Sequence, residues 1–150
     1  MRQIVVTIFA ILAALPLVAD PALWSREWPQ TNFEKTTLVN WSEIISGGPP
    51  KDGIPALVDP AFVAAGDAAL PQNEPVITVE LAQQTPRAYP LRYLMWHEIV
   101  NDRIGAHPVA VTFCPLGNSG LTFDRRLDGR VLEFGVSGKL RGSDMVMYDR

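Results

Sequence analysis

Residues 93–126 read YLMWHEIVNDRIGAHPVAVTFCPLGNSGLTFDRR, and this stretch decides the predicted fold. At its centre, residues 109–114 alternate in a way that predicts a strand with two distinct faces. One face carries Val109, Val111 and Phe113, and the other carries Ala110, Thr112 and Cys114. Cys114 ends the strand, since Pro115 keeps the residue before it extended. A turn is predicted at residues 117–120, before a second strand at residues 121–126.

Two short helices are predicted before this strand. The first covers about residues 59–68, where Asp59 is a favourable N-cap and Pro60 suits the first helical position. The second covers residues 92–101, whose apolar side chains fit one face of a short helix. It is expected to end at Asn101-Asp102, because asparagine and aspartate favour turns over helix interiors.

The rest of the chain has the pattern of short strands joined by turns. Residues 75–81 alternate, and residues 87–91 return as a hairpin partner. Asp128-Gly129 is a strong hairpin signal that leads into a return strand at 131–136, and a last strand is predicted at 145–148. The predicted fold class is therefore α+β and β-rich: a single antiparallel sheet or partial barrel with two short helices, preceded by an N-terminal signal segment.

Residues 1–19 have the layout of an export signal. Arg2 supplies the positive charge, residues 4–14 are apolar apart from one threonine, and a small residue precedes Asp20. The apolar run is shorter than the ~20 residues of a membrane-spanning helix. We therefore expect a periplasmic or secreted protein that contacts the membrane only if this segment stays uncleaved. Residues 20–40 are predicted to be an irregular lead-in whose aromatic side chains dock on one domain at residues 41–150.

The composition narrows the range of partners. The chain has 150 residues, which is enough for one domain with a hydrophobic core. Without residues 1–19 it carries 12 basic and 16 acidic residues, so it lacks the basic surface that nonspecific nucleic-acid binding needs. The single cysteine, Cys114, cannot form an internal disulfide. The expected partner is a small ligand or another protein of the cell envelope.

Five stretches of the sequence carry a family resemblance. They are WSEIISGGPPKDGIP at 41–55, WHEIVND at 96–102, CPL at 114–116, FDRR at 123–126 and FGVSGKL at 134–140. In this order and spacing they resemble the domain-of-unknown-function 3179 family of exported bacterial proteins. The resemblance covers about residues 41–150. It implies a domain of that family and names no activity.

The chain departs from the family in two respects. Many relatives read Cys-Pro-Leu-Cys, whereas Gly117 stands at the fourth position here. The chain therefore lacks the second thiol that a disulfide, or a metal site with two thiolates, would require in that motif. The family pattern also continues past Arg150, which implies a fragment or a C-terminally short version of the domain.

Cys114 is the leading candidate for chemistry. A thiol at a strand end, facing the backbone N–H groups of a turn, suits a binding site or a stabilised thiolate. His97 is its candidate partner, either as a second metal ligand or as a base. In the alternative, Cys114 packs as a small apolar side chain and His97 is hydrogen-bonded within its helix.

Other polar residues are candidates because of their position beside Cys114 or within the stretches above. The candidate ligand-binding residues are Asn118, Ser119, Asp124 and Arg125. Asp124 and Arg125 can instead form a buried ion pair. The basic residues at 125–141 alternate with acidic ones, which favours a paired, solvated surface over an anion site. His107 is interpreted as structural or exposed.

Three functions follow as hypotheses. The first is an exported single-domain protein that binds a small ligand or a soft metal such as copper(I) at a pocket built by Cys114, His97 and the 115–120 turn. Further soft ligands for that pocket are Met95, Met145 and Met147, together with His107. The second is an enzyme with Cys114 as nucleophile and His97 as base. The third is a non-catalytic interaction module in which the same stretches serve packing and loop geometry.

Overall fold

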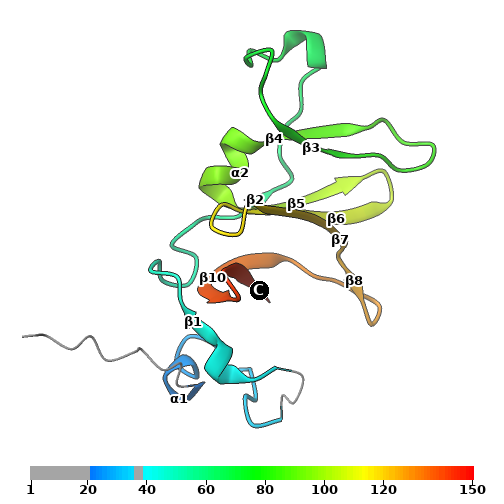
Figure 1. Ribbon diagram of the computed structural model, residues 1–150. Helices are drawn as coiled ribbons and strands as arrows, with labels where there is room; N and C mark the ends of the chain where they lie inside the picture. The colour runs from blue at the N-terminus through cyan, green and yellow to red at the C-terminus, as the bar shows by residue number, and fades with distance from the viewer. Residues whose placement is uncertain (1–20, 36–38) are drawn as a thin grey trace, which may run out of the picture.

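The computed structural model describes residues 21–35 and 39–150 (Figure 1). The export signal predicted at residues 1–19 lies outside these ranges. None of the helices within them is long and apolar enough to cross a membrane. In chain order, the elements are α1 Pro21–Trp24, η1 Trp41–Glu43, β1 Ile44–Ser46, β2 Leu57–Val58, η2 Ala65–Asp67, β3 Val76–Val79, β4 Arg87–Pro90, α2 Leu91–His97, β5 Ile99–Ile104, β6 His107–Cys114, β7 Ser119–Asp124, β8 Arg126–Leu127, β9 Arg130–Val131, β10 Phe134–Arg141 and β11 Asp144–Asp149.

The strands form two main sheets and two ribbons. The larger sheet has the order β2-β5-β6-β7, the smaller has the order β1-β10-β11, and β3–β4 and β8–β9 pair separately. In Figure 1 the β3–β4 hairpin, the larger sheet, the smaller sheet and the N-terminal lead-in follow one another as layers. The predicted β-rich class is confirmed. The single antiparallel sheet or partial barrel is wrong, because the described strands divide into four sheets and β2 pairs parallel with β5.

The two predicted faces of β6 are confirmed. Val109, Val111 and Phe113 join a hydrophobic core with Val79 of β3, Tyr89 of β4 and Leu94 of α2. The hairpin and α2 therefore cover this face of the larger sheet. The other face of β6 carries Ala110, Thr112 and Cys114, which are also buried. A central strand covered on both faces explains why nearly every residue of β6 is buried.

Asn101 connects the two main sheets. Its side chain donates from Nδ2 to the Phe134 carbonyl oxygen at 2.8 Å and accepts from the Phe134 backbone N–H at 2.8 Å. Asn101 is fully buried within β5, so these two bonds satisfy an amide that would otherwise be costly to bury. We call this pair the Asn101 bridge; it joins β5 of the larger sheet to β10 of the smaller one.

The helix predicted at 59–68 is wrong. Only a single 3-10 turn forms, at Ala65–Asp67. Asp59 has φ 46°, which is incompatible with the extended conformation of an N-cap. Residues 61–67 are exposed, and the edge-to-face contact of Phe62 with Tyr89 is too little to stabilise a helix this short.

The helix predicted at 92–101 is correct only in its first part. α2 ends at His97, because Glu98 has φ 58° and leaves the helical conformation. Asn101 and Asp102 belong to β5 instead of forming the end of the helix. Alternation along β5 sends Asp102 toward the hairpin and Asn101 toward the smaller sheet, and these two polar contacts stabilise the strand.

The predicted hairpins are confirmed. β3 and β4 pair antiparallel, and Asp128-Gly129 joins β8 to β9 with positive φ at both residues, as a two-residue hairpin turn requires. The strand predicted at 121–126 is interrupted at Arg125, whose side chain turns into the protein. β10 and β11 pair with a bulge between Val136 and Lys139. Gly138 lies in this bulge with φ 71°.

The aromatic lead-in docks on the smaller sheet. Trp24 is buried and makes edge-to-face contacts with Phe33 and Trp41. Trp28 makes the same kind of contact with Tyr148 of β11. The ammonium of Lys139 lies 3.5 Å from the Glu27 carboxylate and 5.4 Å from the Trp28 ring centre. The lead-in therefore covers the face of β10–β11 that points away from the larger sheet.

Candidate functional site

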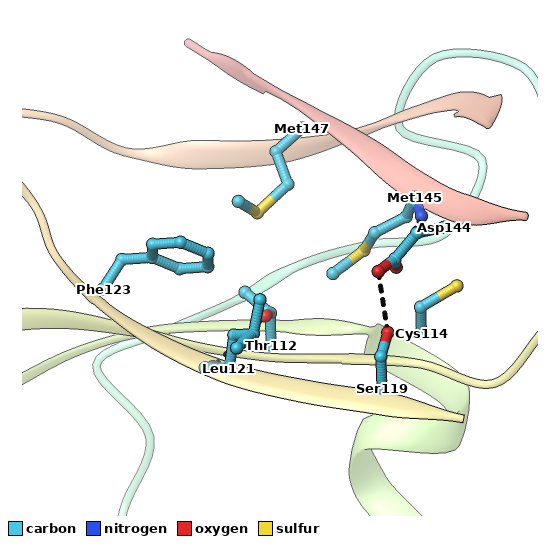
Figure 2. A pocket seen from close by; sticks show the side chains of 8 residues that line it. All are labelled: Thr112, Cys114, Ser119, Leu121, Phe123, Asp144, Met145 and Met147. Atoms are coloured by element: carbon cyan, nitrogen blue, oxygen red, sulfur yellow. Dashed lines mark hydrogen bonds between the residues drawn. The ribbon is translucent and has the colours of Figure 1, made fainter. Parts of the chain in front are cut away.

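A small cleft lies between the larger sheet and β11 of the smaller sheet (Figure 2). Its volume is about 60 Å³. The side chains that line it are Thr112, Cys114, Ser119, Leu121, Phe123, Asp144, Met145 and Met147. Three of these eight side chains end in or contain sulfur, which makes the cleft unusually rich in soft donor atoms.

The two-residue period of each strand builds this lining. Thr112 and Cys114 come from the inner face of β6, and Ser119, Leu121 and Phe123 come from the facing side of β7. Met145 and Met147 project from β11 toward them, as Figure 2 shows. Sequence reasoning named both methionines as possible soft ligands, but their place beside Cys114 depends on the packing of one sheet on the other.

Cys114 lies at one end of the cleft and is only 2% exposed. Its thiol donates a hydrogen bond to the Ser143 carbonyl oxygen, with the sulfur 3.7 Å from that oxygen. Gly117 lies beside the same end: a Cβ built on Gly117 would stand 3.3 Å from both Ser119 Oγ and Ser143 O. Residue 117 therefore lies close to Ser119 and to the carbonyl oxygen that accepts the thiol hydrogen bond, and as glycine it places no side chain there.

Ser119 and Asp144 form a hydrogen bond across the cleft. Ser119 Oγ of β7 donates to Asp144 Oδ2 of β11 at 2.8 Å, drawn as the dashed line in Figure 2. The other carboxylate oxygen, Oδ1, accepts from the Met145 backbone N–H at 2.9 Å. Of the four predicted ligand-binding residues, only Ser119 lines this cleft.

The two histidines do not join Cys114 in the cleft. His97 Nδ1 donates to the Pro55 carbonyl oxygen at 2.8 Å, which leaves Nε2 of the neutral ring as an acceptor. α2 packs through Leu94 on the hairpin side of β6, whereas Cys114 faces the opposite side. His107 and Cys114 are the first and last residues of β6, about 20 Å apart along an extended strand. His107 is half-buried, and neither histidine lines the cleft.

The predicted Asp124–Arg125 ion pair is wrong. Asp124 pairs with Arg126 at 2.5 Å on the surface, and hydrogen bonds from that arginine lower the pKa of Asp124 to about 2. Arg125 is buried and donates to the carbonyl oxygens of Leu132, at 2.7 Å, and Asp102, at 3.1 Å. Asn118 is an exposed turn residue with φ 46°.

Arg130 and Arg141 are paired with carboxylates, in keeping with the paired, solvated surface that the charge alternation favours. Arg130 lies 3.8 Å from Asp149, and Arg141 lies 2.8 Å from Glu43. Arg150 bridges Asp52 and Glu133, at 2.9 Å and 3.2 Å respectively. These contacts account for the charge alternation and leave no concentrated anion site in this region of the described structure.

Sequence reasoning missed a buried polar cluster around Asp102. Arg87 Nη1 donates to both carboxylate oxygens of Asp102 at 2.5 Å, and the Tyr89 hydroxyl donates to Oδ2 at 2.6 Å. Burial raises the pKa of Asp102, but the hydrogen bonds from Arg87 and Tyr89 outweigh it and hold that pKa below its ordinary value. Burial and the neighbouring carboxylate both raise the pKa of Tyr89. Arg87 and Tyr89 lie on β4 of the hairpin, and both bind Asp102 of β5. The cluster therefore holds the hairpin on the larger sheet.

The oxygen and nitrogen ligands of an ordinary metal site do not gather anywhere in the described ranges. Within residues 21–35 and 39–150, no group of three or more histidine, cysteine, aspartate and glutamate side chains is placed to hold an ion. Methionine thioethers are a further class of metal ligand, outside that set. The cleft supplies two of them next to a thiol.

The layers and the cleft define a small β-rich domain built from two facing sheets. The chain belongs to the family described as "Protein of unknown function (DUF3179)", which matches residues 51–150. The predicted resemblance is thus confirmed, with the match beginning ten residues after residue 41. A comparison with curated proteins finds no match, and a comparison with solved structures finds none.

Proposed function

We propose that this chain is an exported protein that binds a soft monovalent metal ion, copper(I), in the cleft between its two sheets. The ligands are Cys114, Met145 and Met147. The observation that carries the proposal is that these three side chains, from two strands of different sheets, line one cleft. Export is supported only by the signal-like sequence at residues 1–19.

The size of the cleft favours a metal ion over an organic ligand. Pockets for drug-sized molecules have volumes of roughly 300–1,000 Å³, whereas this cleft has about 60 Å³. At about 60 Å³ the cleft has room for an ion or for a few water molecules.

The ligand chemistry favours copper(I) among metal ions. Thiolate and thioether sulfur are soft donors that suit copper(I), whereas zinc sites use thiolate, imidazole and carboxylate, and calcium and magnesium use oxygen. A bound monovalent ion and one thiolate also cancel in charge. To bind, the Cys114 side chain must turn from the Ser143 carbonyl oxygen into the cleft and lose its proton.

The other two hypotheses gain no such support. A cysteine nucleophile needs a base within hydrogen-bond reach, but Cys114 donates to Ser143 and His97 donates to Pro55. The two groups pack on opposite sides of β6. An interaction module would not require two methionines to share a cleft with the single thiol of the chain.

Titration of the purified protein with copper(I), in the absence of oxygen and against a coloured chelator, tests the proposal. We expect one ion per chain. Loss of an outer-shell partner alone weakens metal binding 10–100-fold, so Cys114→Ser is expected to raise Kd at least about 100-fold. Met145→Leu and Met147→Leu, which keep the side-chain volume, are each expected to raise Kd about 10-fold.

Met95→Leu is the matched control. Met95 is 53% exposed on α2 and does not line the cleft, so its loss is expected to leave Kd within twofold of the unchanged protein. Silver(I), which is redox-silent, provides a second probe of the same site. A Cys114→Ser variant that binds copper(I) as tightly as the unchanged protein would refute the proposal. So would equal losses in Met95→Leu and Met145→Leu.

A further inference from the structure

We infer that the hydrogen bond between Ser119 and Asp144 is a latch that closes the cleft and sets the rate at which metal enters and leaves it. The inference rests on the proposed function, because it assigns a role to two residues of the same cleft that are not metal ligands. Its structural basis is the way the two sheets are held together: by two buried hydrogen bonds along one side, and along the other by the Ser119–Asp144 bond with the Cys114–Ser143 bond beside it.

The firm side is formed by β5 and β10. The Asn101 bridge supplies two hydrogen bonds of 2.8 Å to the Phe134 backbone, and Asn101 is fully buried. Separating the sheets here would break both hydrogen bonds and leave the backbone N–H and carbonyl of Phe134 unsatisfied in a buried position. This side therefore acts as the hinge of the two-sheet arrangement.

The opposite side is formed by β7 and β11. Each is the outer strand of its sheet, so each is held by backbone pairing on one edge only. In the part of the chain that the structure describes, the side-chain hydrogen bond between these two strands is the one from Ser119 to Asp144. Parting β7 from β11 therefore breaks one polar contact, whereas parting β5 from β10 breaks two buried ones.

The latch lies at the end of the cleft that holds the thiol. Ser119 is paired with Cys114 in the β6–β7 register, and Asp144 directly follows Ser143, which accepts the thiol hydrogen bond. Cys114 is 2% exposed, whereas Leu121 and Phe123, farther along β7, are 55% and 38% exposed. Figure 2 shows the Ser119–Asp144 bond next to Cys114, with Phe123 and Met147 toward the other end. An ion can thus approach the thioethers from the exposed end but reaches the thiol only when the latch opens.

Gly117 lies beside the latch. The space in which its Cβ would lie is bounded by Ser119 Oγ and Ser143 O at 3.3 Å and by the Asp144 carboxyl carbon at 3.7 Å. The turn after β6 therefore lies close to both sides of the latch. A movement of β7 away from β11 would open this end without disturbing the core beneath the hairpin, which lies on the other face of β6.

Ser119→Ala tests the inference through the kinetics of metal exchange in the full-length protein. With the latch removed, uptake and chelator-driven release of copper(I) are both expected to accelerate about tenfold, as loss of a hydrogen bond to a charged group predicts. Kd is expected to change less than twofold, because the ligands are intact. Ser119→Thr, which retains the hydroxyl, is expected to restore the original rates. Thr122→Ala, which removes a hydroxyl from the alternate face of β7, is the matched control.

Amide hydrogen exchange of the metal-free protein supplies a readout that does not depend on metal binding. Ser119→Ala is expected to speed exchange in β7 and β11 and to leave β5 and β6 unchanged, which also shows that the variant folds. Copper(I) binding with unchanged rates in Ser119→Ala would overturn the latch and leave the proposed function standing. Absence of copper(I) binding in the unchanged protein would overturn the proposed function, and the gating role with it.

Discussion

Gly138→Ala is expected to destabilise the domain by about 3–5 kcal/mol, from the combined cost of a left-handed residue and of overpacking. Gly138 has φ 71°, a conformation that costs any residue with a Cβ. A Cβ there would also stand 3.0 Å from the Pro49 carbonyl carbon, 3.1 Å from the Pro50 oxygen and closer still to the Pro49 oxygen. All of these are backbone atoms, which cannot move aside cheaply.

Gly129→Ala separates the two causes. Gly129 has φ 75°, but nothing lies within 4 Å of the Cβ that would be added. Its substitution is therefore expected to cost only the conformational part, about 1–2 kcal/mol. Urea unfolding of both variants measures the difference, with the slope m checked for constancy. A loss in Gly138→Ala no larger than that in Gly129→Ala would show that the loop at residues 47–53 does not hold β10 as closely as described.

Asp102→Ala is expected to cost about 2–4 kcal/mol of folding free energy. Removal of one partner from a buried ion pair typically costs 3–5 kcal/mol, and the value is reduced here because the Arg87 side chain is 29% exposed and regains some water. Tyr89 also loses the acceptor of its buried hydroxyl. A double variant with Arg87→Met removes the unpaired cation and is expected to recover part of the loss.

The contribution of Asp102 to the free energy of unfolding should depend on pH in a defined direction. The pKa of Asp102 is lower in the folded protein than the ~3.9 of an unfolded chain. The carboxylate therefore contributes its full stabilisation above about pH 5, and this contribution is lost as the pH falls through the lowered folded pKa. The difference in unfolding free energy between the unchanged protein and Asp102→Ala should shrink in acid.

Asp124→Ala is the control for burial. Asp124 and Arg126 also form an ion pair of 2.5 Å, but both side chains are exposed to water. Surface pairs of this kind contribute little, so the substitution is expected to leave stability nearly unchanged. If Asp124→Ala lowers the free energy of unfolding as much as Asp102→Ala does, burial is not what makes the Arg87–Asp102 pair stabilising.

Local sequence patterns predicted the strands and turns that depend on near neighbours. The alternation of residues 109–114 assigned each side chain of β6 to its correct face, and Asp128-Gly129 marked its hairpin. The family was also recognisable from short stretches such as FGVSGKL at 134–140. Several of these stretches meet in the fold: Gly138 packs on Pro49, and the Asn101 bridge reaches Phe134.

The errors arose where distant contacts overrode local preference. Asp59-Pro60 is a good helix start, but residues 61–67 are exposed and form only a 3-10 turn at Ala65–Asp67, and the Phe62 ring packs on Tyr89 of β4 instead of along a helix face. Asn101-Asp102 resembles the end of a helix, but both residues are held in β5 by partners far along the chain. Neither outcome is visible in a short window of sequence, because the stabilising groups come from β4 and β10.

The sequence by itself determined the family, the β-rich class, the faces of the central strand and the presence of one thiol with two methionines on a later strand. Only the tertiary structure decided which groups meet that thiol. Two-residue alternation fixes the side of a strand on which a side chain lies, but the packing of one sheet on another fixes what it faces. β6 separates Cys114 from α2 and His97, and β11 brings Met145 and Met147 to it.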